Sequence, residues 1–384
     1  MVALLLLTAT VVSCSGNRTT ACTSDAVTAR SLSDLHSFTT WVHQNGVQGA
    51  IGEVGWPGEP AGADAAKWNT LAKKWYAAAD DAQVGVFAWS AAERWAPDYP
   101  LAIYRNSGLA APGAAPYVIG SQAQVVESHL SADGGLRGVS LADGTFGASL
   151  DNGSRYSTSN RGTYGTDYVY PSSQFLQFLA SRGIRQMRLA FTWERLQPVL
   201  NAPLDPIEVG RLVSVLHAAA GAGISVVLDL HNYGRYAEQT PGAGRNVLLL
   251  GSSELPASAL ADFWGRLAPV LPASKAISGY GIMDEPHDLP GGAKGWEAAS
   301  ALAVTAIRRT DARTPIYVGG YAHSSAAGWP QEHPKPWIPP VNWPVVYEAH
   351  QYFDTSREGF YQENYGQTNA AAAKQGWADC SAPL

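Results

Sequence analysis

Apolar and polar residues follow two different patterns along this chain, and the two patterns alternate. Short apolar runs of strand length are separated by longer stretches in which apolar residues recur every three or four positions, as on one face of a helix. This alternation is typical of a parallel sheet whose strands are joined by helices. The eight predicted strands are residues 48–54, 84–90, 136–141, 184–191, 224–230, 277–283, 315–319 and 344–351.

Helical patterns lie between most of these strands. Eight strands with intervening helices predict one (β/α)8 barrel, in which the active site forms where the strands deliver their carboxyl ends. The predicted helices are residues 33–44, 64–79, 172–181, 206–222, 256–267 and 293–308.

The alternation of strand and helix patterns is interrupted between Trp95 and Gly134, in a stretch rich in Pro, Gly and Ala. Only one helix is predicted there, over residues 122–130. This composition is typical of a connecting segment.

Composition narrows the class of partner. The chain has 384 residues, of which 46% are hydrophobic, enough to bury the core of one large domain. Only 15% of residues are charged and the net charge is −6, which gives no basic field for nucleic acid or anionic lipid. We therefore expect an uncharged partner and a monomer. The nine histidines are scattered and no phosphate-binding glycine loop is present, so we predict neither a metal nor a cofactor.

The first ten residues form an apolar run too short to span a bilayer, as in a secretory signal. The string around Cys14 resembles a bacterial lipoprotein box, although no Lys or Arg precedes Arg18. We expect residues 1–21 to be an export segment, and the protein to be secreted or held outside the cell by a lipid on Cys14. In an oxidising compartment Cys22 and Cys380 would pair, and two unpaired thiols are the alternative.

Two glutamates stand where predicted strands end. Glu53 lies in the string IGEVGWP, and Glu285 lies in GIMDEPHD, where Pro286 cannot continue a sheet ladder. A pair of strand-end carboxylates suggests glycoside hydrolysis, in which a retaining enzyme places the two groups roughly 5 Å apart.

These two strings resemble the nucleophile and acid/base motifs of glycoside hydrolase family 5, the cellulase-like retaining enzymes. The resemblance implies that Glu53 is the nucleophile and Glu285 the acid/base. That family carries the acid/base motif first, whereas here it comes second, so the resemblance implies a circular permutation.

The implied permutation cuts the barrel after its sixth strand, so that the chain starts at the helix before strand 7. Residues 22–95 then correspond to the C-terminal part of the family and residues 135–384 to its N-terminal part. Residues 96–134 join the old ends, all within a single catalytic domain of residues 22–384. Termini of folded domains often lie close together, so such a rearrangement costs little.

The resemblance extends to further strand ends. It implies that Arg188 orients the nucleophile and favours its ionised form, and that His231 contacts the sugar. His350 would support the acid/base, Tyr352 would donate a hydrogen bond to the nucleophile, and Trp89 would form the floor beneath the sugar. Four more tryptophans lie in or beside predicted loops at the same end and serve either as sugar subsites or as core: Trp193, Trp329, Trp337 and Trp343.

Asp284 departs from the family, which has asparagine before the acid/base. An ionised carboxylate there can only accept hydrogen bonds, and it would raise the pKa of Glu285 by repulsion. Three explanations are open: a natural shift in preference at the sugar 2-hydroxyl, a protonated Asp284 that still donates, or an engineered Asn-to-Asp change.

The sequence thus predicts a retaining β-glycosidase without a cofactor, acting on an oligo- or polysaccharide. A β-1,4-glucanase is the leading expectation, from the resemblance of the strings FTWERLQP and DLHNYGRY. An exo-acting β-glucosidase, or an enzyme for mannan, β-1,3-glucan or a glycoconjugate, is the alternative within the class. A carbohydrate-binding pseudoenzyme and a surface lipoprotein are the alternatives of another class.

Overall fold

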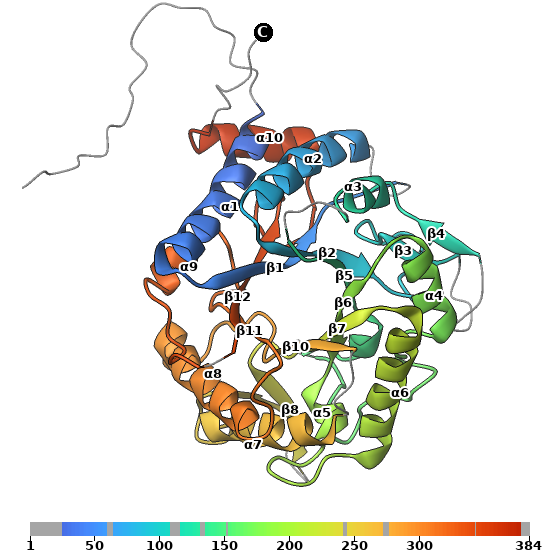
Figure 1. Ribbon diagram of the computed structural model, residues 1–384, viewed down its shortest axis with the longest axis vertical. Helices are drawn as coiled ribbons and strands as arrows, with labels where there is room; N and C mark the ends of the chain where they lie inside the picture. Colours follow the sequence, from blue (N-terminus) through green and yellow to red (C-terminus); the bar gives the residue numbers. More distant parts are fainter. Residues whose placement is uncertain are drawn as a thin grey trace, which may run out of the picture.

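The predicted barrel is confirmed. The computed structural model describes residues 25–59, 64–107, 116–130, 135–150, 153–240, 244–271, 276–341 and 343–377. Within them eight parallel strands lie side by side in the order β1, β12, β11, β10, β7, β6, β5 and β2, and β1 pairs with β2 to close the ring (Figure 1). All eight predicted strands are in this barrel.

The elements have the following bounds. The strands are β1 (Gln48–Gly55), β2 (Gly85–Ala91), β3 (Tyr104–Asn106), β4 (Tyr117–Ile119), β5 (Arg137–Leu141), β6 (Gln186–Phe191), β7 (Ser225–Leu230), β8 (Arg235–Thr240), β9 (Gly244–Leu249), β10 (Ile277–Gly281), β11 (Ile316–Gly319) and β12 (Val345–Tyr352). The α-helices are α1 (Ala26–Asn45), α2 (Ala65–Asp81), α3 (Ala123–Ser128), α4 (Ser173–Ser181), α5 (Trp193–Leu196), α6 (Pro206–Ala222), α7 (Ala257–Leu267), α8 (Gly292–Arg308), α9 (Trp329–Glu332) and α10 (Tyr365–Lys374). Two short 3-10 helices are η1 (Asp143–Thr145) and η2 (Ala268–Val270).

The outer helices begin and end where the sequence supplies caps. Helix α6 starts at Asp205, whose side chain accepts hydrogen bonds from two backbone N–H groups, and Pro206 occupies the first turn, where no N–H is needed. It ends at Gly223 in the left-handed conformation, with φ 71°. Helix α10 starts with a reciprocal capping box between Asn364 and Gln367.

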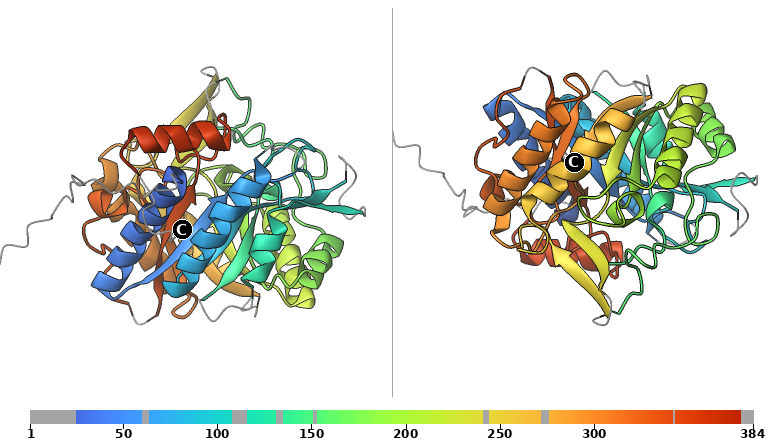
Figure 2. Two further views of the ribbon diagram at one scale, coloured as in Figure 1. Left: turned by 90° about the horizontal axis from the view of Figure 1, so that it is seen from above. Right: turned by 90° about the horizontal axis from the view of Figure 1, so that it is seen from below.

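Two pairs of strands were not predicted. In the stretch interpreted as a connector, β3 extends the sheet beside β2 and pairs with the antiparallel β4, while α3 confirms the predicted helix. Strands β8 and β9 form an antiparallel hairpin between β7 and α7, which Figure 2 shows projecting from the barrel. Strands of three residues carry too little alternation to be recognised in the sequence.

The strands of the barrel send alternate side chains into its interior. On β12, Val346 packs with apolar residues from four other strands, and the positions two, four and six residues further along are Glu348, His350 and Tyr352. On β7 the same alternation runs from Val227 to Asp229. The interior is therefore layered, with apolar residues below and a buried polar layer towards the carboxyl ends of the strands.

The first and last described helices lie against each other (Figure 1). The hydroxyl of Tyr365 in α10 donates to Asp25 at the start of α1 over 2.6 Å, and the backbone N–H of Val27 donates to Asn369 over 3.0 Å. The two ends of the described chain thus meet on one side of the barrel.

Some expectations fall outside the described residues. These are the export segment, the lipid on Cys14 and the pairing of Cys22 with Cys380. Across the part of the chain that the structure describes, no helix combines the length and apolarity needed to cross a bilayer.

Candidate active site

The nucleophile candidate, Glu53, is held at the end of β1 by an irregularity in that strand. The register of β1 against β12 shifts between Ile51 and Glu53, so that Gly52 is an extra residue. A Cβ atom on Gly52 would lie 2.4 Å from the carboxyl carbon of Glu348, so only glycine fits there. The shift and the glycine together place Glu53 beside the residues of β12.

Glu53 is 3% exposed and both of its oxygens are bound. Arg188 donates to Oε1 over 2.9 Å, and the hydroxyl of Tyr352 donates to Oε2 over 2.6 Å. These are the contacts that the sequence predicted. Burial raises the pKa of Glu53, and although His350 and Arg188 act in the opposite direction, the pKa remains above its ordinary value. Arg188 thus acts in the expected direction, towards the ionised form, but burial has the larger effect.

Four carboxylates share Arg188. Its Nη1 lies 2.9 Å from Glu53 and 3.0 Å from Asp229, and its Nη2 lies 2.6 Å from Asp284 and 3.1 Å from Glu348. The side chain of Arg188 is 1% exposed, so this cluster is isolated from solvent. His231 and His350 contact the same carboxylates, so three basic groups face four buried acids, and burial with the remaining negative charge favours protonation within the cluster.

The acid/base candidate, Glu285, stands across the barrel mouth from Glu53. It follows β10, which ends at Gly281, two residues before the predicted end. Glu285 has the left-handed φ of 39°, a conformation uncommon for a non-glycine residue. A carboxylate oxygen of Glu53, one of Glu285 and a ring nitrogen of His350 all lie within 4.8 Å of one another.

Two histidines contact the carboxylate of Glu285. His350 Nδ1 lies 2.8 Å from Oε1, as predicted, and His323 Nδ1 lies 3.6 Å from Oε2. Burial alone would raise the pKa of Glu285, but hydrogen bonds from His323 and His350 outweigh burial and lower the pKa. The expectation that Asp284 raises the pKa of Glu285 is therefore wrong, because Asp284 is turned towards Arg188 instead.

Asp284 is 1% exposed. Its Oδ1 accepts from Arg188 over 2.6 Å, whereas Oδ2 accepts no hydrogen bond from the described residues and lies 3.3 Å from His231 Nδ1. Burial raises the pKa of Asp284 to about 8; the positive charge of His231 opposes this rise, and the charges of Glu53 and Asp229 add to it.

His231 and Trp89 form one wall of the site. Their rings are stacked, with centroids 5.6 Å apart and an interplanar angle of 11°. His231 Nδ1 lies 2.8 Å from Asp229 and its Nε2 lies 3.0 Å from the hydroxyl of Tyr233. The structure thus brings all eight sequence-predicted site residues to one end of the barrel, while the contacts of His231 and Trp89 with sugar stay predictions.

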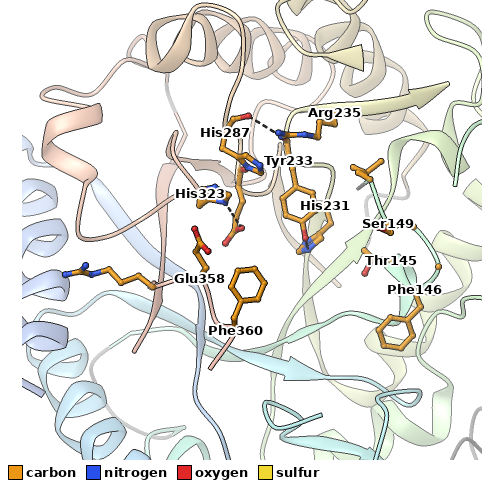
Figure 3. A pocket seen from close by; sticks show the side chains of 15 residues that line it. Thr145, Phe146, Ser149, His231, Tyr233, Arg235, His287, His323, Glu358 and Phe360 are labelled. Carbon is orange, nitrogen blue, oxygen red and sulfur yellow. Dashed lines mark hydrogen bonds and ion pairs between the residues drawn. The ribbon is translucent and has the colours of Figure 1, made fainter. Parts of the chain in front are cut away.

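Glu285 and His231 line a cavity of about 700 Å³, whose labelled side chains Figure 3 shows. Its lining includes several residues that the sequence analysis did not single out, chiefly from loops: Phe146, Tyr233, Arg235, His287, His323 and Phe360. Phe360 is 66% exposed, which is unusual for a large apolar side chain. Three of these residues lie inside strings quoted above, His287 in GIMDEPHD and Tyr233 and Arg235 in DLHNYGRY, whereas the others stand in loops without a strand-end pattern.

The four further tryptophans do not line this cavity. Trp193 and Trp329 are fully buried in the core, and Trp337 stacks on His333 beneath the surface. Trp343 is 44% exposed but precedes β12, at the opposite end of the barrel from Tyr352. Their interpretation as sugar subsites is wrong, and core packing is the correct alternative for the first three.

Among the described residues, two groups have the spacing to hold a metal ion: Glu53 with Glu285 and His350, and Glu53 with His231 and Asp284. In both groups Arg188 or a histidine already supplies a positive charge to the carboxylates. The carboxylates of both groups therefore already have cationic partners within the protein.

The closed parallel barrel, with two glutamates facing each other at its carboxyl end, has the architecture of a (β/α)8 glycoside hydrolase. The model of the family described as Cellulase (glycosyl hydrolase family 5) matches residues 144–381. The chain belongs to this family.

Curated relatives include the manganese dependent endoglucanase Eg5A of Phanerodontia chrysosporium, 27% identical over 217 residues, which are 54% of this chain and 53% of that protein. Endo-beta-1,4-glucanase B of Emericella nidulans is 27% identical over 218 residues, 55% of this chain and 60% of that protein. The chain thus spans little more than half the length of these relatives. Among solved structures, endoglucanase Cel5A of Pseudomonas stutzeri in complex with cellobiose is 35% identical, with a TM-score of 0.50 over 60% of this chain and 63% of that one.

Proposed function

We propose that this protein is a retaining glycoside hydrolase that cleaves β-1,4-glucan. The observation that carries the proposal is the approach of Glu53 and Glu285, whose oxygens lie within 4.8 Å. Retaining glycosidases place their two carboxyl groups about 5 Å apart, whereas inverting enzymes leave roughly 6.5–9.5 Å for a water molecule.

The contacts of each glutamate position it for its role. Arg188 and Tyr352 hold both oxygens of Glu53, which leaves its carboxylate fixed for attack on the anomeric carbon. Glu285 gives its proton to the departing oxygen as that bond breaks. It then takes a proton from water, which attacks the glycosyl–Glu53 ester and releases the sugar with Glu285 protonated again.

The substrate class rests on the names of the relatives and on the cavity. Both curated relatives and the Pseudomonas stutzeri protein are named endoglucanases. Phe146, Tyr233 and Phe360 offer aromatic faces at the mouth of the site, on which sugar rings can stack. A polysaccharide substrate also fits a protein that acts outside the cell, and we propose a secreted monomer, with lipid anchoring on Cys14 as a second form.

Asp284 fits this reaction as a neutral carboxylic acid. Its buried Oδ2 has no hydrogen-bond partner among the described residues, and the Arg188 cluster already holds an excess of carboxylates. Of the three explanations for this residue, we propose the protonated one, because a neutral carboxyl keeps a donor where the family has an amide.

We also propose that the chain is a circular permutant of its family. The family match begins at residue 144 and so omits β1, β2 and Glu53, as it would if those elements belonged at the other end of the family's order. The meeting of α1 with α10 supports this, because it leaves the described ends side by side. In this permutant, the C-terminal part of the family corresponds to residues 22–95 and its N-terminal part to residues 135–384. The connector is residues 96–134.

The direct test is turnover of soluble β-1,4-glucan, with mannan and β-1,3-glucan as competitors, followed through new reducing ends. The anomer released first should be β by proton NMR. Glu53→Gln and Glu285→Gln should each lower the rate by at least about 100-fold, because each removes a reacting group. The exposed Glu254→Gln is the matched control and should behave as the unmodified protein.

The outcomes separate the alternatives. Glucan binding without turnover would support the pseudoenzyme, preference for mannan or β-1,3-glucan would move the substrate class, and release of the α anomer would exclude the retaining mechanism.

A further inference from the structure

Phe360 is a large apolar side chain that the fold leaves in water at the mouth of the site. It stands in the segment after β12 and is 66% exposed. Burial of a phenylalanine stabilises a fold, since about 25 cal/mol is gained for every Å² of apolar surface removed from water. An exposed aromatic ring beside the cavity of Glu285 is therefore a candidate contact for a ligand that covers it.

The segment is fixed on the N-terminal side of Phe360. The N–H of Gly359 donates to Asp354 Oδ1 over 3.0 Å. Gly359 has a left-handed φ of 80°, and a Cβ atom there would lie 2.8 Å from the ring of Tyr352, so the backbone rests directly on that ring. Because the hydroxyl of Tyr352 donates to Glu53, the position of Phe360 is tied to that of the nucleophile candidate.

The segment is fixed on the C-terminal side of Phe360 as well. The hydroxyl of Tyr361 accepts from the N–H of Phe353 over 2.9 Å and donates to the carbonyl oxygen of Gly55 at the end of β1. The backbone on both sides of Phe360 is thus bound to the ends of the strands that carry the site. The exposed ring has the supported position that a binding residue needs.

Phe360 lies between two hollows of the surface. It lines the cavity that contains Glu285 and also a second cavity of about 370 Å³, and Glu358 is common to both. The remaining residues of the second cavity are polar: Asp354, Thr355, Ser356, Gln362 and Glu363. An apolar ring followed by hydrogen-bonding groups suits a sugar chain, whose rings have apolar faces and hydroxyl edges. The surface that begins at Glu285 thus continues past Phe360.

The two glutamates divide the ring of strands into two arcs (Figure 1). Glu53 is on β1, and Glu285 follows β10. One arc between them consists of β2, β5, β6 and β7, and it carries Trp89 and His231, whose stacked rings form the predicted wall for the attacked sugar. The other arc consists of β12 and β11, and Phe360 belongs to it.

A glycosidic bond cleaved between the two glutamates has its sugar towards one arc and its leaving group towards the other. With the attacked sugar against Trp89 and His231, the leaving group faces the arc of Phe360. Figure 3 agrees with this division, because Phe360 and Glu358 lie on one side of the cavity and Phe146 lies on the other.

We propose that Phe360 binds the leaving-group part of the glucan, with one glucose ring stacked on its face and the chain continuing into the second cavity. The inference rests on the proposed function and specifies its substrate as glucan that extends on both sides of the cleaved bond. On the other side, the first cavity reaches residues 145–150, where further sugars of the chain lie. Phe360 is then a specificity-determining residue of an enzyme that cuts within chains.

The test compares cellopentaose with β-cellobiosyl fluoride, whose leaving group has no sugar ring. Both substrates are measured on each protein sample, so the ratio of the two kcat/KM values is independent of the fraction that is folded. Phe360→Ala should lower the ratio of cellopentaose to fluoride about 10-fold, because it removes a stacking contact. Phe360→Trp keeps an aromatic face and should retain the ratio. Ile207→Ala removes an equally exposed apolar side chain from α6 and is the matched control, with an unchanged ratio expected.

Transfer to an added sugar is the second readout. The glycosyl group is trapped with an activated 2-deoxy-2-fluoro-β-cellobioside, and cellobiose is then added as the acceptor. A hydroxyl of cellobiose attacks the anomeric carbon, the bond to Glu53 breaks, and Glu285 takes the hydroxyl proton. Because the acceptor occupies the leaving-group side, the cellobiose concentration for half-maximal recovery of activity should rise about 10-fold in Phe360→Ala.

The outcomes separate this inference from the proposed function. An unchanged ratio in Phe360→Ala would overturn the role of Phe360, and equal losses on both substrates would place the ring beside the attacked sugar instead. An unchanged cellobiose requirement would overturn the role as well. An unmodified protein that hydrolyses neither cellopentaose nor the fluoride would refute the proposed function itself.

Discussion

At the residue scale, the site assigns opposite surroundings to its two glutamates. Glu53 is buried beside a guanidinium that is shared among four carboxylates, and its pKa is raised. Glu285 is contacted by two histidines, and its pKa is lowered. These directions are the reverse of those that an ionised nucleophile and a protonated acid would have, so the proposed roles rest on the positions and contacts of the two carboxyl groups.

Asp284 gives a prediction that depends on pH. Its pKa is raised to about 8, so between the ordinary carboxyl range and that value the folded protein holds a proton that the unfolded chain has lost. Stability must then fall as the pH rises through this window, because the folded state binds more protons. Asp284→Asn removes this pH-dependent loss of stability, because asparagine does not ionise. The Tm of the variant should therefore exceed that of the unmodified protein by about 2 °C or more at pH 7. The difference should shrink towards pH 4, as measured by thermal unfolding.

The same variant should keep glucan turnover and extend it to pH values above 8, where the unmodified protein ionises the buried acid. A Tm difference that is independent of pH, or a lower Tm for the variant at pH 7, would contradict a protonated Asp284.

Much of the site could be predicted at this scale, because its residues sit in strings at strand ends. Arg188, His231, His350 and Tyr352 were found in this way, and their contacts are local consequences of barrel register. His323 was not, because its position depends on a left-handed loop that β12 holds in place. The rise in the pKa of Glu53 was not predicted, since its main cause is burial, which is visible only in three dimensions.

At the scale of elements, the irregularity in β1 determines how the site is assembled. Two residues of β1, Gly52 and Glu53, stand where β12 offers one. The extra residue must be glycine because Glu348 fills the space its Cβ would take. The strand, the buried polar layer and the nucleophile candidate are therefore coupled at a single position.

Gly52→Ala tests this coupling. A methyl group at this position forces the carboxylate of Glu348 aside and disturbs its contact with Arg188, which in turn holds Glu53. We expect a loss of glucan turnover of at least about 100-fold, in line with the cost of small displacements of reacting groups. The barrel should remain folded by circular dichroism. Gly210→Ala, in the exposed helix α6 with open space around the glycine, is the control and should retain full activity. Activity in Gly52→Ala close to that of the unmodified protein would contradict the coupling.

The elements themselves could be predicted where their period is long. The eight barrel strands and the helices between them follow apolar patterns set by burial on both faces. Strands β3, β4, β8 and β9 lie outside the barrel and lack that pattern, and β10 ends before Met283 because the chain turns there to present Glu285.

At the scale of the whole molecule, the order of elements along the chain is separate from their order around the barrel. Strand β1 carries one glutamate and the segment after β10 carries the other, yet β12 and β11 bring them to one mouth. The chemistry of the site depends only on the order of the strands around the barrel. A barrel with adjacent ends can be opened at several connections without loss of its core.

A rearranged chain tests the permutation. Its order would be residues 135–377, a short Gly/Ser linker, and residues 25–130, which restores the family's order of motifs. Since α1 and α10 already touch, we expect the rearranged protein to fold with similar helix content and to hydrolyse glucan at a rate close to that of the original. The same chain with its opening inside α8 is the control and should fail to fold, because that opening cuts a helix packed on α7. Insolubility of the first chain with folding of the second would contradict the proposed correspondence.

If Glu53 attacks the sugar while Glu285 handles the proton, covalent trapping of the glycosyl group will mark Glu53. The protein is incubated with an activated 2-deoxy-2-fluoro-β-cellobioside, which slows release of the glycosyl group, and is then digested and analysed by mass spectrometry. We predict one added fluoroglycosyl group per chain, located on Glu53 and absent from Glu53→Gln. A label on any other residue, or none under conditions in which the protein hydrolyses glucan, would contradict it.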